Sequence, residues 1–113
     1  AAPGPLAYGS ARAKMQGQEV LFRQMCADDL AFEDGSFDVV WSSMFLHELS
    51  KKQRAKVFEE AFRVLKPGGL MLHMELPPNE QMGAFDGFYL DWDSYYNNEP
   101  YYTSFRSQKP VEL

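Results

Sequence analysis

The sequence is poor in cysteine and in positive charge, and it lacks a long apolar run. Cys26 is the only cysteine, so neither an internal disulfide nor a cysteine-based metal cluster can form. Asp and Glu outnumber Lys and Arg by 16 to 11, and this acidic balance argues against nucleic acid or an anionic membrane surface as a partner. No apolar run approaches the roughly 18 residues of a membrane span. These absences favour a soluble, cytoplasmic domain.

The first residues contain neither an initiator methionine nor a signal peptide. Residues 1–5 are small and rich in proline, without the basic region and apolar core of a secretory signal. We therefore expect either a processed product or a piece of a longer chain.

The order of the predicted elements indicates an α/β fold. A helix is expected over residues 6–15, ended by Gly17, and a short strand over residues 19–23. Residues 37–43 form a short apolar run after an Asp-Gly turn, which is typical of a buried parallel strand.

The clearest predicted element is a helix over residues 50–66. Ser50 and Gln53 have the spacing of a capping box, and a Pro-Gly-Gly sequence ends the helix before a strand over residues 70–76. The apolar face of the helix is expected to contain Phe58, Ala61, Phe62 and Leu65. Strand, helix and strand make a right-handed parallel βαβ unit.

The last third of the chain has a different character. More than half of the aromatic residues lie between Phe85 and Phe105, interleaved with acidic and amide side chains. The spacing is irregular and predicts short helices and loops. We therefore divide the chain into a partial α/β core, residues 1–78, and an aromatic-rich segment of the same domain, residues 79–113.

Three segments carry a resemblance to a known family, namely residues 27–40, 45–49 and 63–69. They resemble the link from strand 3 to strand 4, the segment after strand 4 and the segment before strand 5 of class I S-adenosylmethionine-dependent methyltransferases of the ubiquinone/menaquinone-biosynthesis type. The resemblance implies an incomplete Rossmann-like layer. It also implies methyl transfer from S-adenosyl-L-methionine to a small organic acceptor in the full-length parent protein.

The resemblance assigns residues to the cofactor. The family holds the adenine ring through a side chain that falls on Cys26 and a backbone N–H that falls on Ala27. Cys26 departs from the family pattern, because a thiol is a weak hydrogen-bond partner. Asp28 either takes its place or is a solvated loop acid. Ser42 and Ser43 complete the cofactor set, since ligands of open α/β sheets bind at the carboxyl ends of strands.

Two cofactor-binding features of the family have no counterpart in the chain. These are the glycine-rich loop after strand 1 and the acidic residue that takes the ribose hydroxyls. Hydrogen bonds to charged groups contribute about 1.5–3 kcal/mol each, so losing two weakens a site by roughly two to four decades. We therefore expect the 113 residues alone to bind S-adenosylmethionine weakly or not at all. The alternative is a non-catalytic, self-associating remnant of the fold.

His47 is the candidate catalytic residue, because an imidazole titrates near neutrality and can act as a general base. The alternative is a histidine that only forms part of the pocket wall. The second histidine of a zinc-protease helix is missing, and no metal site is predicted. Phe45, Phe88, Tyr89 and Trp92 are expected to line the pocket for the small-molecule acceptor. The aromatic tail alternatively packs against the scaffold or a second subunit.

The strand order of the family predicts a homo-oligomer. That order is 3-2-1-4-5, so without strands 1 and 2 the strand over residues 37–43 has a bare, apolar edge. Such edges pair with whatever strand is available. The acceptor atom stays open between oxygen, nitrogen and carbon, because methyl transfer from a sulfonium needs alignment rather than side-chain chemistry.

Overall fold

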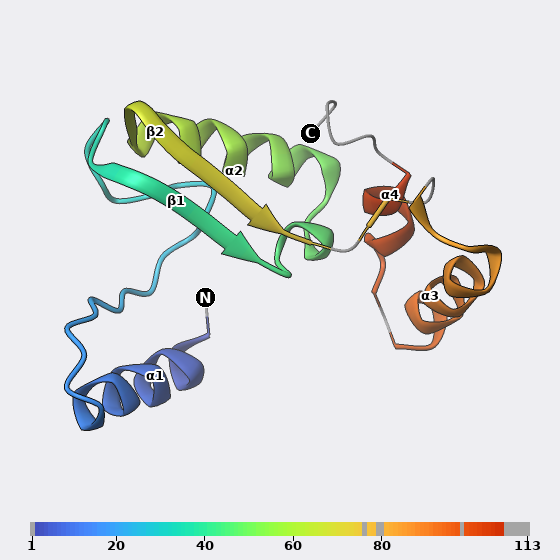
Figure 1. Ribbon diagram of the computed structural model, residues 1–113, viewed down its shortest axis with the longest axis horizontal. Helices are drawn as coiled ribbons and strands as arrows, with labels where there is room; N and C mark the ends of the chain where they lie inside the picture. The colour runs from blue at the N-terminus through green and yellow to red at the C-terminus, as the bar shows by residue number, and fades with distance from the viewer. Residues whose placement is uncertain (1, 76, 79–80, 98, 108–113) are drawn as a thin grey trace.

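The computed structural model describes residues 2–75, 77–78, 81–97 and 99–107. Two strands, β1 and β2, form a parallel sheet, and α2 makes the crossover between them on one face (Figure 1). The predicted α/β class is confirmed, as a partial Rossmann-like layer. In the described part of the chain no helix is both long and apolar enough to cross a membrane. The elements in order are α1 (Pro3–Met15), β1 (Phe37–Ser43), the 3-10 helix η1 (Leu46–Glu48), α2 (Lys51–Val64), β2 (Leu65–Met74), α3 (Ala84–Tyr96) and α4 (Tyr102–Arg106).

The capping box at the start of α2 is present in both directions. The Gln53 N–H donates to the Ser50 hydroxyl at 3.3 Å, and the Ser50 N–H donates to the Gln53 side-chain oxygen at 3.1 Å. The predicted apolar face of α2 is correct for Ala61, which is buried, and for Phe58, which packs against the core, but it is wrong for Phe62, which is 75% exposed. The buried residues of the helix are Arg54, Val57, Ala61 and Val64.

The Pro-Gly-Gly turn lies inside β2 rather than before it. α2 ends at Val64 and β2 begins at Leu65, five residues before the predicted start. Gly68 has φ +78, and a Cβ on Gly69 would lie 2.9 Å from the Asp38 carbonyl oxygen. Only glycine fits such a close approach of two backbones. The predicted end of this strand, residue 76, lies outside the described residues, as do residues 79–80, 98 and 108–113 of the predicted aromatic segment.

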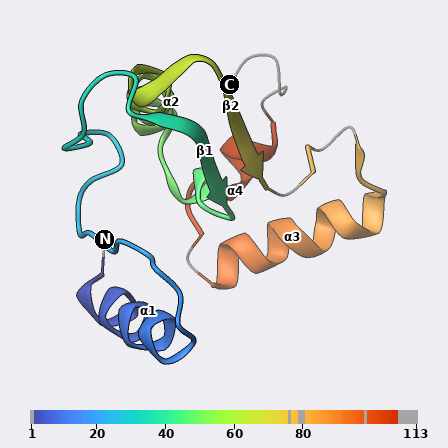
Figure 2. The ribbon, with the colours of Figure 1, turned by 60° about the vertical axis from the view of Figure 1, so that its left-hand side comes forward.

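The strand predicted over residues 19–23 is wrong. These residues form neither helix nor strand, and Val20 and Leu21 are 56% and 73% exposed. A strand forms only where a neighbour completes its hydrogen bonds. Within the described residues the sheet contains β1 and β2 alone, and strand 2, which neighbours this strand in the family order, has no counterpart among them. α1 precedes it, begins earlier than predicted at Pro3, buries no side chain and lies away from the sheet (Figure 2).

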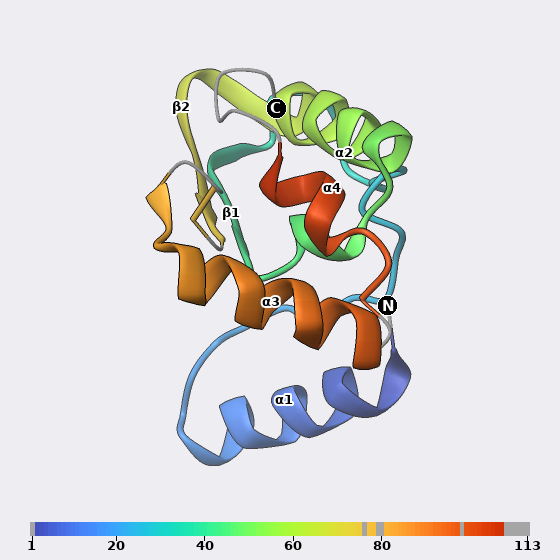
Figure 3. The same ribbon diagram turned by 90° about the vertical axis from the view of Figure 1, so that its right-hand side faces the viewer.

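The aromatic-rich segment forms two helices, in line with the helices and loops expected there. α4 packs against η1 and against α3, as Figure 3 shows. The Arg106 side chain is buried and joins the two helices, since its Nη1 donates to Asp91 at 2.8 Å and its Nη2 to the Gly87 carbonyl at 3.4 Å. The hydrophobic core lies beneath η1, between α2 and α4, around Leu46, Val57 and Phe105.

Candidate functional site

The candidate site lies where the two parallel strands end. β1 ends at Ser43 and β2 at Met74, and the Met44 N–H donates to the Met74 carbonyl at 2.7 Å. Met44 has φ +50, the left-handed region that a side chain rarely adopts. This conformation turns the chain out of the sheet, so that residues 45–49 cross the carboxyl edge.

A pocket of about 290 Å³ opens beside this crossing loop. It brings together three of the residues predicted to bind the cofactor, Cys26, Ala27 and Asp28, with Phe45 from the predicted substrate set. A tight turn presents the first three, because the Asp29 N–H donates to the Cys26 carbonyl at 3.2 Å. The remaining lining residues are Met25, Leu49, Gln53 and Val57. The pocket therefore combines an apolar wall with a short polar loop, and the Cys26 thiol is exposed rather than buried.

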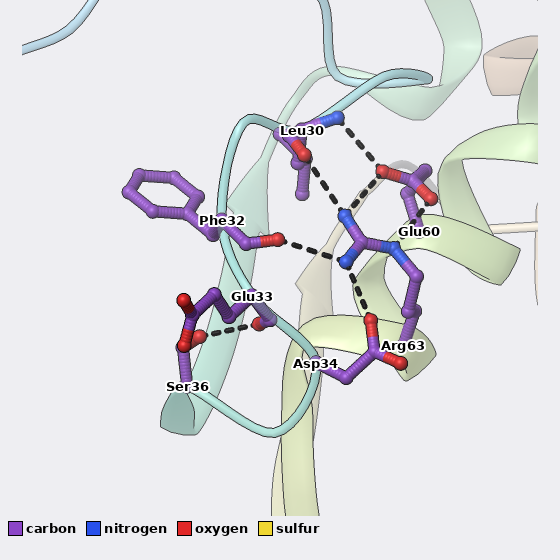
Figure 4. A network of polar contacts seen from close by, with 7 residues as sticks. All are labelled: Leu30, Phe32, Glu33, Asp34, Ser36, Glu60 and Arg63. Carbon is purple, nitrogen blue, oxygen red and sulfur yellow. Dashed lines mark hydrogen bonds and ion pairs between the residues drawn. The ribbon is translucent and has the colours of Figure 1, made fainter.

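A salt-bridge network holds the segment that follows the Cys26–Asp29 turn (Figure 4). Arg63 donates to both oxygens of Glu60, to one oxygen of Asp34 and to the carbonyls of Leu30 and Phe32, at distances of 2.7–2.8 Å. Glu60 also accepts the Leu30 N–H at 2.8 Å. All five N–H donors of the guanidinium are used. The Arg63 side chain therefore fixes residues 30–34 to the last turns of α2.

The network shifts both of its central ionisable groups. Hydrogen bonds from Arg63, and then from the Leu30 N–H, lower the pKa of Glu60 from 4.5 to about 2. The Glu60 and Asp34 carboxylates raise the pKa of Arg63 in turn. Both charges are therefore present over the whole physiological range. The turn that leads into β1 adjoins this network, and in it the Ser36 hydroxyl donates to the Glu33 carbonyl.

His47 is buried and is held by a residue that the sequence analysis did not single out. The Glu75 carboxylate lies 2.8 Å from His47 Nδ1, and it accepts the Phe45 N–H at 2.7 Å and the Leu46 N–H. Both side chains are more than nine-tenths buried. A carboxylate directly after an apolar strand, at the edge where ligands bind, is the sequence signal for Glu75.

Ser42 and Ser43 lie at the end of β1 but outside the pocket lining. The Ser42 hydroxyl is 2.6 Å from Nδ1 of His73 on β2, and the Phe58 ring of α2 packs edge-on against that imidazole. Burial lowers the pKa of His73, and the charge of Glu75 opposes this effect. The pair therefore forms part of the packing between the sheet and α2.

The other three predicted substrate residues lie on α3. Phe88, Tyr89 and Trp92 are 66%, 54% and 48% exposed, and they do not line the pocket with Phe45. Trp92 packs against Tyr96, with ring centroids 4.9 Å apart. The structure thus gathers the adenine-binding candidates but leaves the aromatic residues of α3 open. In the described residues no group of three or more His, Cys, Asp or Glu side chains is arranged to hold a metal ion.

Comparison with known proteins gives a consistent result. Residues 2–73 match the family described as "Methyltransferase domain". The chain is 39% identical to an uncharacterized methyltransferase of Synechocystis over 72 residues, which is 64% of this chain and 33% of that protein. It is 37% identical to demethylmenaquinone methyltransferase of Thermus thermophilus over 84 residues, 74% of this chain and 37% of that protein.

A third relative is the ubiquinone/menaquinone biosynthesis C-methyltransferase of Bartonella henselae. It is 37% identical over 89 residues, which is 77% of this chain and 33% of that protein. The chain thus spans about a third of the length of each of these three relatives. The family match over residues 2–73 covers β1, α2, all but the last residue of β2 and the loops that form the pocket. The chain belongs to the methyltransferase-domain family.

Proposed function

We propose that the protein transfers a methyl group from S-adenosylmethionine to a small organic acceptor, as part of a longer methyltransferase. The observation that carries this proposal is the pocket at the carboxyl edge of the sheet, which joins Cys26, Ala27 and Asp28 to Phe45. An aromatic wall suits the flat adenine ring, while a backbone N–H and a carboxylate suit its polar edge. Relatives named as methyltransferases of quinone biosynthesis support a small organic acceptor.

Within the proposal, the 113-residue chain binds S-adenosylmethionine weakly. Calorimetric titration of the chain with S-adenosylmethionine tests this directly. We expect no micromolar dissociation constant, because the glycine-rich loop and the ribose-binding acid have no counterpart in the sequence. A micromolar constant would contradict the expected weak binding.

At millimolar ligand, Phe45→Ala should reduce the residual binding, while Phe62→Ala, on an exposed part of α2, should leave it unchanged. Equal binding by both variants would contradict the proposal that the ligand binds in the pocket lined by Phe45.

A second candidate function is self-association without catalysis. The sheet face opposite α2 is open, with Val39, Trp41, Leu70, Leu72 and Met74 between 47% and 65% exposed. Together these side chains form an exposed apolar patch of the kind that marks protein–protein contacts.

Sedimentation at tens of micromolar tests the self-association. A dimer that Trp41→Lys converts to a monomer would support this surface, because a buried lysine without a partner opposes association. A stable monomer would exclude it. The cytoplasmic location stays a prediction from the sequence.

A further inference from the structure

We propose that Glu75 is a positioning residue, which sets the wall of the cofactor pocket and the tautomer of His47 from the neighbouring strand. The inference rests on the proposed function, because the wall in question is Phe45, which lines the proposed adenine pocket. Glu75 itself does not line that pocket. It acts through the three consecutive residues whose hydrogen bonds it accepts.

The contacts concentrate on one carboxylate. The N–H groups of Phe45 and Leu46 share Oε1, and His47 Nδ1 binds Oε2. The Glu75 side chain is 8% exposed, so water cannot replace these donors. Hydrogen bonds to an ionised acceptor are roughly twice as strong as neutral ones. One side chain at the end of β2 thus holds the backbone of the loop that leaves β1.

The loop needs these hydrogen bonds because it begins in an unfavourable backbone conformation. Met44, directly before Phe45, has φ +50, which persists only where the surroundings hold it. The Met74 carbonyl holds the Met44 N–H, and Glu75 holds the next two N–H groups. Without Glu75 the N–H groups of Phe45 and Leu46 lose their acceptor, and the position of Phe45 on the pocket lining is no longer fixed from β2.

Glu75 also determines which nitrogen of His47 carries hydrogen. An ionised carboxylate only accepts hydrogen bonds, so Nδ1 is the donor of the pair at 2.8 Å. In the neutral ring Nδ1 then carries the hydrogen and Nε2 the lone pair. The His47 ring packs edge-on near Phe105 of α4, with centroids 6.4 Å apart. The aromatic segment therefore meets the loop at the residue that Glu75 orients.

The test compares Glu75→Gln with Glu48→Gln in the whole chain. Glutamine has a single acceptor oxygen and an NH2 donor, so it cannot accept all three hydrogen bonds. Glu48 is exposed in the same short helix, so its variant removes the same charge and leaves these contacts in place. The readouts are the ring ¹⁵N shifts of His47 and the amide exchange rates of Phe45 and Leu46.

Glu75→Gln is expected to move the His47 ring away from the Nδ1–H tautomer and to speed exchange of both amides about tenfold or more. Glu48→Gln should match the wild type. Unchanged shifts and rates in Glu75→Gln would overturn the proposal. A wild-type spectrum with the hydrogen on Nε2 and none on Nδ1 would overturn it without any variant, even where Glu75→Gln fails to fold.

A titration with millimolar S-adenosylmethionine separates this inference from the proposed function. The dissociation constant read from the shift changes at Phe45 and Ala27 should be about tenfold larger for Glu75→Gln than for Glu48→Gln. Equal dissociation constants for the two variants would overturn the proposal that Glu75 positions the pocket wall, and would leave the proposed function standing. No response in the wild type would contradict the proposed function, while the His47 and amide readouts would still decide the role of Glu75.

Discussion

The two ends of the sheet are each organised by one charged side chain, but in different ways. At the amino end, Arg63 on α2 donates to three acceptors in the loop before β1 and to both oxygens of Glu60 on its own helix, and its side chain is 32% exposed. At the carboxyl end, Glu75 collects three donors from the loop after β1 and is 8% exposed. The network at the amino end is partly exposed to solvent and ties the loop before β1 to α2. The contacts at the carboxyl end are buried and fix the loop beside the pocket.

The hollows at the two ends also differ. The larger one, about 560 Å³, lies at the amino end between Asp34 and the turn at Gly68. The smaller one, about 290 Å³, lies at the carboxyl end and contains the residues that the family resemblance assigns to adenine. Parallel α/β sheets bind ligands at the carboxyl end, because loops from neighbouring strands converge there. Size alone is therefore a poor guide to the site in this chain.

The largest expected effect is at the carboxyl end. Glu75→Ala should lower the free energy of unfolding by about 3 kcal/mol, because it leaves the buried His47 and two loop N–H groups without their acceptor. Urea unfolding followed by circular dichroism measures this. A loss under about 1 kcal/mol would mean that water or another group replaces the carboxylate, and that the loop does not depend on it.

At the amino end, Arg63→Lys should loosen the loop without unfolding the chain. An ammonium group cannot reproduce the planar set of five donors, so the contacts to Glu60 and to the Leu30 carbonyl cannot all be kept. Amide exchange of Leu30 should become about tenfold faster, while exchange of Phe45 at the other end stays unchanged. Equal acceleration at both ends would show that the two ends are not independent.

A smaller effect depends on pH. The pKa of Glu60 is about 2 in the folded chain and is ordinarily 4.5, so its ionised form is favoured by folding. This contribution is complete above the ordinary value and is lost as the pH falls from about 5 towards 2. The stability difference between wild type and Glu60→Gln should therefore shrink over that range. Glu59→Gln, one residue away and exposed, is the matched control and should show no such trend.

The smallest effect is expected at Phe62. This ring is 75% exposed on α2 despite its place in the predicted apolar face. Phe62→Ala should change the free energy of unfolding by less than about 0.5 kcal/mol, as is usual for surface positions. Thermal unfolding checks this, and a loss above about 2 kcal/mol would indicate that the ring is covered in solution, for example by a second copy.

Local signals in the sequence predicted much of this structure. The Ser50–Gln53 spacing located the start of α2, and the apolar run over residues 37–43 located β1. Both of these predictions depend only on residues that are close together in the sequence. The sequence assigned Cys26 to the cofactor and Phe45 to the acceptor pocket, and both residues lie on the lining of one pocket in the structure.

Features that depend on distant contacts were not predictable in the same way. Residues 19–23 suit a strand, but in the part of the chain that the structure describes they pair with neither β1 nor β2. The contacts of Arg63 and Glu75 join residues about thirty positions apart, so no periodicity reveals them. Phe62 was wrongly placed on the buried face of α2 for a similar reason, because the sheet and α4 decide which side of the helix is covered.

The most direct test of the account is a ¹⁵N-resolved titration of the chain with S-adenosylmethionine that compares the two ends of the sheet. The proposed site predicts shift changes at Ala27, Asp28 and Phe45, around the smaller hollow, and none at Gly35 or Gly68, around the larger one. Shift changes confined to Gly35 and Gly68 would contradict the proposed site and, with it, the role assigned to the carboxyl end.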